Sequence, residues 1–157
     1  MKDFKTLVTE LRAFTVKKRR AAAVELGKSG NLSAIEPLAA AFLDSHPSVR
    51  SDIAQALGRL GDSDALPTLI IALSDPKPGI RCAAITALGK IKDRAAVSPL
   101  ICCLKDKDMT VRIGAAEVLG KLHDPCVIEP LTALINDPFS EVREAVESAI
   151  KKLQSRT

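Results

Sequence analysis

The arrangement of apolar and polar residues along this chain repeats at a constant interval. Leu-Gly pairs begin at 26, 57, 88 and 119, aspartates stand at 44, 75, 106 and 137, and arginines stand at 19, 50, 81, 112 and 143. Within residues 80–110, one stretch has Ile80, Ala84, Ala87, Leu88 and Ile91 at helical spacing, and a shorter one has Val97, Leu100, Ile101 and Leu104. A fixed period of this kind, with two amphipathic stretches in each period, predicts a stacked array of helix pairs.

The residues between the two stretches also recur and are typical of helix starts. Asn31, Asp62, Asp93 and Asp124 precede the second helix, where a side-chain oxygen can accept a hydrogen bond from a free backbone amide. Pro37, Pro67, Pro99 and Pro130 fall in its first turn, where a missing amide proton costs little. The glycine inside each first helix costs about 1 kcal/mol relative to alanine, so we expect it to allow close approach of the partner helix in the same repeat. The fifth repeat has Lys151 at this position, as expected if no helix follows.

The pattern divides the chain into four full repeats, 18–48, 49–79, 80–110 and 111–141, flanked by partial ones. Residues 1–17 are interpreted as an N-terminal capping helix that corresponds to the second helix of a repeat, with Phe4, Leu7, Val8, Leu11 and Phe14 on one apolar face. Residues 142–157 are interpreted as a C-terminal capping helix. The polar outer faces of both caps lead us to expect a whole array. The expected fold is a single all-α domain over 1–157, a right-handed α-α superhelix of about ten helices in five layers.

Composition narrows the classes of function. Of the residues, 46% are hydrophobic, yet there are four Phe, no Trp and no Tyr, so few side chains could stack on nucleic-acid bases. We expect no membrane span, because the longest apolar runs are too short. Without a leader-like start, and with four cysteines that form no CxxC pair, a cytoplasmic protein is expected. A monomer is plausible, and no cofactor is expected.

The recurring motif Val-Arg-x-x-Ala-x-x-x-Leu-Gly-x-Leu-x-Asp, followed by Ala-Ile/Val/Leu-x-Pro-Leu and a terminal Asp, resembles the HEAT-like repeat. It is most similar to the short variety found in phycobilisome lyase subunits, which fits the short interval between successive motifs. The resemblance covers residues 18–153 and implies a HEAT-like solenoid. It also implies that an aspartate and an arginine six residues apart cross-link successive repeats. These residues form a structural ladder of Asp44, Arg50, Asp75, Arg81, Asp106, Arg112, Asp137 and Arg143.

Basic residues form a candidate binding site for a polyanion. Residues 1–30 hold eight Lys or Arg against three acidic residues, and Lys17, Lys18, Arg19 and Arg20 are consecutive, which would suit a polyanion. Lys28, Arg59, Lys90, Lys121 and Lys152 follow the repeated glycine, where a cation also complements the C-terminal end of a helix. Both interpretations stay open, and the lack of stacking aromatics argues against nucleic acid as the polyanion.

The solvent-facing line of the second helices is the candidate binding surface. It reads Ala40, Ile71, Cys102 and Ala133, with Glu36, Glu129 and Lys105 among its flanking residues. Small apolar residues between polar edges fit a shallow groove for a partner segment. The alternative is that these residues are half-buried against neighbouring helices and have no further role.

No catalytic or metal site is expected. His46 and His123 lie two and a half repeats apart, too far to share an ion easily. Of the vicinal pair Cys102 and Cys103, the second is expected in the core and the first nearer the surface, and no His or acid constellation activates either. The favoured function is therefore a non-catalytic scaffold for a protein or peptide partner. The alternatives are a bilin lyase or chromophore-handling subunit, which would make the chain a lyase-type enzyme, and a polyanion-binding protein.

Overall fold

The computed structural model describes residues 2–155 and divides the chain into two compact units, residues 1–91 and 92–157. Ten α-helices and four short 3-10 helices occupy the described residues, with no strand among them. The predicted all-α fold of helix pairs is confirmed. The predicted single domain over 1–157 stays a prediction.

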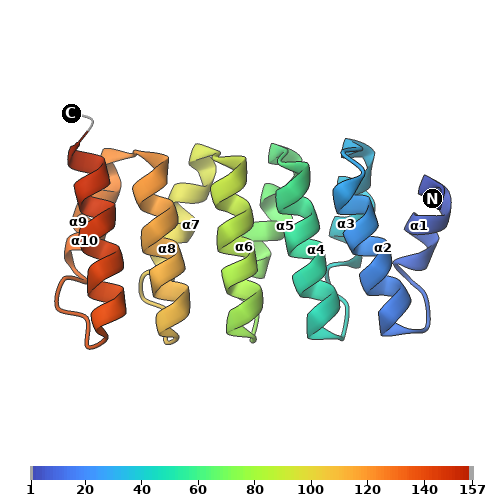
Figure 1. The fold of residues 1–157 in the computed structure, drawn as a ribbon, viewed down its shortest axis with the longest axis horizontal. Helices are drawn as coiled ribbons and strands as arrows, with labels where there is room; N and C mark the ends of the chain where they lie inside the picture. The colour runs from blue at the N-terminus through green and yellow to red at the C-terminus, as the bar shows by residue number, and fades with distance from the viewer. Residues whose placement is uncertain (1, 156–157) are drawn as a thin grey trace. The chain divides into compact units, whose positions relative to one another are not determined.

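The first unit contains six α-helices in which long and short helices alternate. They are α1 (Phe4–Glu10), α2 (Val16–Lys28), α3 (Ile35–Ala41), α4 (Pro47–Leu60), α5 (Leu66–Ala72) and α6 (Pro78–Ile91), with η1 (Leu32–Ala34) and η2 (Ser63–Ala65) before α3 and α5. The long helices α2, α4 and α6 lie side by side, and the short helices α3 and α5 lie behind them (Figure 1). We call the long helices first helices and the short ones second helices.

The second unit repeats this arrangement with four α-helices. The second helices are α7 (Val97–Cys103) and α9 (Ile128–Thr132), preceded by η3 (Arg94–Ala96) and η4 (Pro125–Val127). The first helices are α8 (Met109–Leu122) and α10 (Ser140–Gln154), which pack directly on one another. Second helices therefore share one side of each unit, and first helices share the other.

Helix starts keep the period seen in the sequence. First helices begin at 16, 47, 78, 109 and 140, and second helices at 4, 35, 66, 97 and 128, so both series advance by the same constant step. By this register α1 is a second helix, as predicted from its apolar positions. The predicted caps are confirmed, since Asn31, Asp62, Asp93 and Asp124 each accept a hydrogen bond from the backbone amide two residues later.

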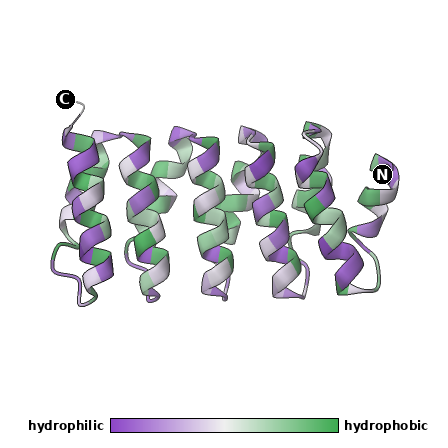
Figure 2. Ribbon diagram, in the orientation of Figure 1, coloured by the Kyte–Doolittle hydropathy of each residue, from purple (hydrophilic) through white to green (hydrophobic). Residues whose placement is uncertain are grey.

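Aliphatic side chains fill the core of each unit. The largest fully buried side chains of the first unit are Leu26, Leu38, Ile53, Leu57, Leu69, Ile85 and Leu88, and those of the second are Leu100, Val111, Leu119 and Leu131. Hydrophobic and hydrophilic residues interleave along each first helix, as amphipathic packing requires (Figure 2). Each helix pair thus buries its apolar side against its neighbours within the unit.

The repeated glycine has a different role from the one predicted. A Cβ on Gly27 would lie 2.6 Å from Cα of Ala56, and one on Gly58 would lie 2.6 Å from Cβ of Ala87. These alanines belong to the next first helix and not to the second helix of the same repeat. The prediction of close approach is confirmed, but the predicted partner was wrong. The glycine instead brings successive first helices together.

The predicted N-terminal helix is longer than the observed one. The α-helix ends at Glu10, with Leu11 as its C-cap, and Phe14 is fully exposed in the connection to α2. The placement of Phe14 on an apolar helix face was therefore wrong. At the other end α10 (Ser140–Gln154) begins before the predicted range of 142–157 and ends at Gln154, and Lys151 is exposed on it. Residues 156–157 of that prediction lie outside the described residues. No helix among the described residues has the length and apolar character needed to cross a bilayer.

Candidate functional site

The arginine and aspartate ladder forms a bidentate clamp between successive turns. In the first unit, Arg50 Nε lies 2.6 Å from Asp75 Oδ2 and Nη2 lies 3.1 Å from Oδ1, while Nη1 donates to the backbone carbonyl of Asp44 at 2.8 Å. In the second unit, Arg112 contacts Asp137 at 2.9 and 3.0 Å and donates to the carbonyl of Asp106 at 2.8 Å. Each guanidinium thus holds the turn before it and the turn after it.

This geometry corrects the pairing implied by the resemblance. The carboxylate partner of each of these arginines is the aspartate 25 residues later, whereas the aspartate six residues earlier contributes its backbone oxygen. Arg19 is also reassigned. It was grouped with the polyanion-binding residues, but its guanidinium binds Asp44, at 2.9 Å between Nη2 and Oδ1, and donates to two turn carbonyls. Arg19 is therefore the first arginine of the ladder.

The aspartates of the ladder are held as carboxylates. Hydrogen bonds from Arg112 lower the pKa of Asp137, outweighing burial, which raises it, and the backbone amide of Phe139 lowers it further. For Asp75 burial is the largest influence and raises the pKa. The bonds from Arg50 and the Lys77 amide together exceed it and lower the pKa overall. These charges are committed to structure and are not available to a ligand.

The predicted binding residues all lie on the exposed side of the second helices. In the first unit Glu36 and Ala40 belong to α3 and Ile71 to α5, where the Ile71 side chain is 60% exposed. In the second unit Cys102 belongs to α7, Lys105 follows it, Glu129 belongs to α9 and Ala133 is its C-cap, and all four are exposed. The alternative, that these residues are half-buried against neighbouring helices, is therefore wrong.

Three of these residues line one hollow in the second unit. We call it the α7–α9 hollow, with a volume of about 650 Å³, lined by Ile101, Leu104, Lys105, Glu129, Pro130 and Ala133 among others. Buried Leu104 lies at its floor, while Lys105 comes from the α7 side and Glu129 from the α9 side. Cys102 does not line the hollow. Size and lining are those of a site for an apolar group held by a few polar ones.

A corresponding hollow lies in the first unit and was partly missed by the sequence analysis. The α1–α3 hollow, of about 730 Å³, is lined by Val8, Leu11, Arg12, Glu36, Pro37 and Ala40 among others. Glu36 and Ala40 were predicted, but α1 was interpreted as a capping helix and not as part of the binding surface. The sequence did contain a signal for this hollow, because the period aligns α1 with the second helices. That alignment makes α1 the neighbour of α3 on the same side, with Arg12 and Glu36 contributed by the two segments. Ile71 does not line this hollow.

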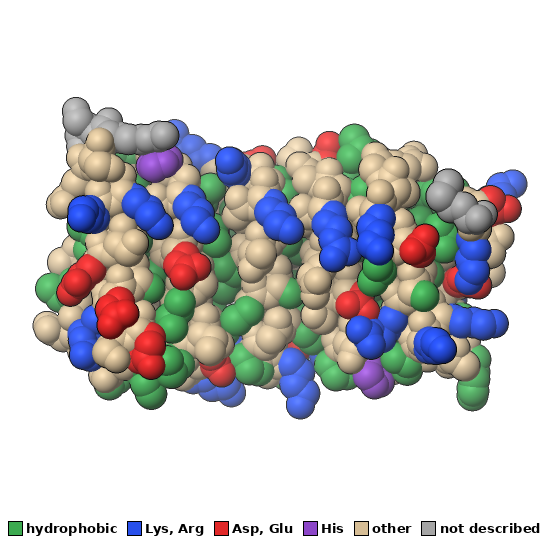
Figure 3. All heavy atoms as spheres, in the orientation of Figure 1, with side chains coloured by type: hydrophobic (Ala, Val, Ile, Leu, Met, Phe, Trp, Pro, Cys, Tyr) green, Lys and Arg blue, Asp and Glu red, His purple; other side chains and the backbone are tan. Residues whose placement is uncertain are grey.

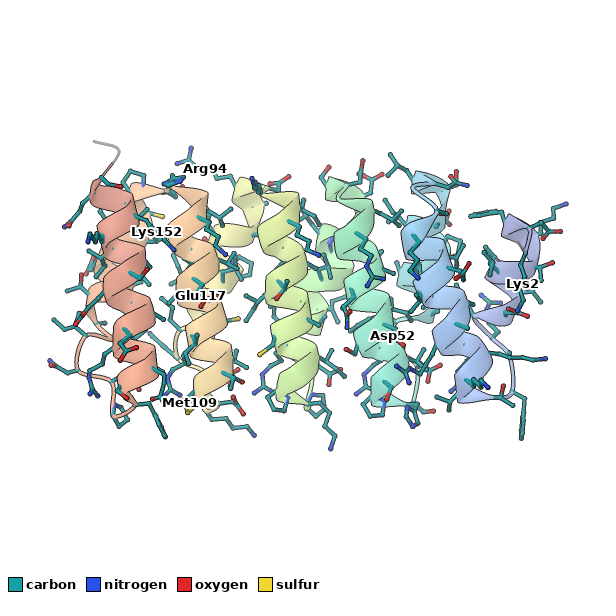
Figure 4. The ribbon with its side chains drawn as sticks, in the orientation of Figure 1. Lys2, Asp52, Arg94, Met109, Glu117 and Lys152 are labelled. Atoms are coloured by element: carbon teal, nitrogen blue, oxygen red, sulfur yellow. The ribbon has the colours of Figure 1, made fainter. Side chains whose placement is uncertain are left out.

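The first helices present charges of both signs. Each carries Lys or Arg in its last turn, and Figure 3 shows these cations near the same end of the helices in each unit. The acidic residues Asp52 on α4 and Glu117 on α8 are labelled in Figure 4, each on the side of its unit that the first helices form. Of the basic cluster, Lys17 and Lys18 are exposed, whereas Arg20 forms an ion pair with Asp52 at 2.6 Å. The basic cluster is therefore reduced from four residues to two.

The cysteines and histidines are dispersed. Cys103 is buried and Cys102 is exposed, as predicted. His46 caps α4, accepting a hydrogen bond at Nδ1 from the amide of Ser48, and His123 is the left-handed residue that ends α8. Within residues 2–155 no three His, Cys, Asp or Glu side chains are grouped as metal ligands.

Comparison with known proteins identifies the repeat. The profile of a family described as HEAT repeats matches residues 4–78 and 66–151, which together cover most of the chain. No curated protein matches the sequence significantly.

Solved structures share the same arrangement of helices. The complex of CpcE and CpcF of phycocyanin lyase from Nostoc sp. PCC7120 is matched with a TM-score of 0.83 and 26% identity, over 99% of this chain and 66% of that one. The chain thus spans slightly less than two thirds of that relative's length. A computationally designed armadillo repeat protein for modular peptide recognition is matched with a TM-score of 0.68 and 18% identity, over 96% and 82% of the two chains. Human deoxyhypusine hydroxylase in complex with glycerol is matched with a TM-score of 0.55 and 18% identity, over 95% and 83%.

Proposed function

Because the chain belongs to the HEAT repeat family, we propose that it is a non-catalytic scaffold that binds a protein or peptide partner along its second helices. Repeat arrays of this kind form extended surfaces that bind partner molecules. The binding face would consist of α3 and α5 in the first unit and of α7 and α9 in the second.

The distribution of exposed apolar side chains carries the proposal. Among the described residues, no large hydrophobic side chain that is exposed lies within a first helix. Leu43, which follows the C-cap of α3, is 85% exposed, and Ile71 on α5 is 60% exposed. Ile128 on α9 and Ile135 beyond it are also exposed. The other exposed apolar residues, Phe14, Leu32 and Phe139, lie in the segments that connect the α-helices. Exposed apolar groups in and just after the second helices, with none inside the first helices, are typical of an interaction surface on the side of the second helices.

Two of the matched structures support a partner of this class. One is a complex between two proteins, CpcE and CpcF, and one is a designed repeat protein for modular peptide recognition. A partner that lays an apolar segment along the second helices would cover Leu43 and Ile71 and place its polar groups against the flanking charges.

The test places one charge on the proposed face and the same charge on the opposite face. Tagged wild-type protein, Ile71→Asp and the control Thr86→Asp, on the exposed side of α6, are used to capture partners from cells that naturally produce the protein. We expect Ile71→Asp to lose at least nine tenths of the captured partner, Thr86→Asp to lose none, and both variants to keep the wild-type unfolding midpoint. Equal capture by all three proteins would contradict the proposed face.

The second candidate is a subunit of a bilin lyase or a chromophore-handling protein. Its support is the likeness to the phycocyanin lyase complex, at 26% identity over nearly the whole chain. Titration of the purified protein with a free bilin, followed by visible absorbance, separates the two candidates. A saturable spectral change at equimolar bilin favours the lyase-type function, and an unchanged spectrum favours the scaffold.

A further inference from the structure

The two hollows are built from the same positions of the repeat. Leu11 and Leu104 are buried at their floors, Arg12 and Lys105 are the cations contributed from one side, and Glu36 and Glu129 are the carboxylates from the other. The members of each pair occupy equivalent positions three repeats apart. The first unit and the second unit thus each contain one hollow with an apolar floor between opposite charges.

The charges that flank the hollows have no partners in the described part of the protein. Arg12, Glu36, Lys105 and Glu129 are exposed, and none of them forms an ion pair or a side-chain hydrogen bond within residues 2–155. This contrasts with the ladder, where Arg112 beside the same α7–α9 hollow is bound by Asp137. A ligand can therefore pair with the flanking charges without breaking an existing contact.

The charge pair is not a general property of the repeat. Between α3 and α5 in the first unit, the positions that correspond to Arg12 and Glu36 are Leu43 and Pro67. The segment between the two hollows in the sequence therefore lacks both the cation and the carboxylate. The α1–α3 and α7–α9 hollows both combine a buried leucine floor with a cation and a carboxylate that form no ion pair among the described residues, and exposed Lys18 adds a second cation to the α1–α3 hollow.

We infer that each unit binds one copy of the same kind of short polypeptide segment, in which an apolar anchor is flanked by one acidic and one basic residue. The anchor fills the apolar floor, the acidic residue pairs with Arg12 or Lys105, and the basic residue pairs with Glu36 or Glu129. This inference rests on the proposed scaffold function and specifies the partner's chemistry. One protein chain then takes up two such segments.

Synthetic peptides test both the chemistry and the number of sites. The probes are fluorescently labelled nine-residue peptides with the central sequences Glu-Leu-Leu-Lys and Lys-Leu-Leu-Glu, because the direction of binding is open. Controls have Glu-Leu-Leu-Glu and Lys-Leu-Leu-Lys. Fluorescence anisotropy at high protein concentration gives the stoichiometry, and dilution gives the affinity. We expect one mixed peptide to bind with two equivalents per chain, at least tenfold more tightly than either uniformly charged control.

Charge-reversal variants assign the two sites. Arg12→Glu and Lys105→Glu should each reduce the stoichiometry from two to one, and the double variant should reduce it to none. Both side chains are exposed and unpaired, so unchanged unfolding midpoints show that the fold is retained. Failure of both mixed peptides to bind, a single site in the wild type, or equal binding of the uniformly charged controls would overturn the inference.

The two proposals can fail separately. If natural partner capture depends on Ile71 while the probe peptides bind once or not at all, the duplicated site is wrong and the scaffold function stands. If capture is also indifferent to Ile71, the proposed face itself is wrong.

Discussion

Glycine and alanine meet at the closest approach between successive first helices. Gly27, Gly58 and Gly120 lie against Ala56, Ala87 and Ala149, in each case an alanine of the next first helix. A helix-interior glycine costs about 1 kcal/mol in propensity, and here it permits backbone contact that any side chain would block. The pair therefore sets the spacing of the first helices.

Gly58→Ala should lower the free energy of unfolding by about 1–3 kcal/mol despite the better helix propensity of alanine, because the new Cβ would lie 2.6 Å from Cβ of Ala87. Gly79→Ala is the matched control, since nothing lies within 4 Å of its added Cβ, and it should raise stability by up to about 1 kcal/mol. Urea denaturation measures both. Recovery of stability in Gly58→Ala combined with Ala87→Gly would identify the contact, and a stabilised Gly58→Ala variant would refute it.

The arginine clamp makes the second residue-scale prediction. Arg112 is 8% exposed and Asp137 is 7% exposed, so loss of the guanidinium leaves the Asp137 carboxylate and the Asp106 carbonyl without this donor. Arg112→Ala should lower the free energy of unfolding by about 1–3 kcal/mol. Lys121→Ala, at an exposed position, should change it by less than about 0.5 kcal/mol. Equal denaturation midpoints for the two variants would show that the clamp does not stabilise the fold.

The lowered pKa of Asp137 predicts acid sensitivity. Its folded pKa lies below the ordinary value of 3.8, mainly because Arg112 donates to it, so the unfolded chain takes up the proton first as the pH falls. The stabilising contribution is complete above about pH 5 and is lost as the pH drops through the folded pKa. Denaturation at pH 7, 4 and 3 should show a steeper loss for wild type than for Asp137→Asn. Parallel losses would mean that this carboxylate does not contribute.

At the scale of the element, each second helix after α1 is started by a short 3-10 turn with its own cap. The side chain of Asp62 accepts a hydrogen bond from the amide of Asp64 at 2.9 Å and begins η2, which continues into α5. Asp62→Ala should lower the free energy of unfolding by about 1 kcal/mol, whereas Asp62→Asn, which keeps the acceptor, should change it little. Thermal unfolding of both variants decides this. Equal midpoints for alanine and asparagine would show that the cap contributes nothing.

The elements were predictable because their signals are local. The apolar spacing within 80–104, the capping aspartates and the prolines placed both helices of each repeat and their connection. The glycine partner and the arginine partner were not predicted correctly, because Gly58 meets Ala87 and Arg50 meets Asp75 only after repeats stack. Pairs so far apart in the sequence leave no periodic signal along one helix, so the six-residue spacing of Asp44 and Arg50 was the more visible one. Arg19 was grouped with the basic cluster although its position fits the arginine period, because Ala13 stands where the other repeats have an aspartate six residues before the arginine.

At the scale of the molecule, the first helices and the second helices have different roles. First helices carry the glycine contacts and the ladder arginines, and their outer side is charged with both signs. Second helices carry Ile71 and Ile128, are followed by Leu43 and Ile135, and line both hollows. The sequence identified this side through Ala40, Ile71, Cys102 and Ala133, but the hollows depend on how consecutive second helices pack. The place of Arg12 and Leu11 in the α1–α3 hollow therefore emerged only from the structure.

Hydrogen–deuterium exchange of the protein with and without its captured partner tests the central claim, that the second helices form the binding face. We predict slower exchange on partner binding in α3 and α5 and in α7 and α9, with α4, α6, α8 and α10 unchanged. Protection confined to the first helices would contradict it.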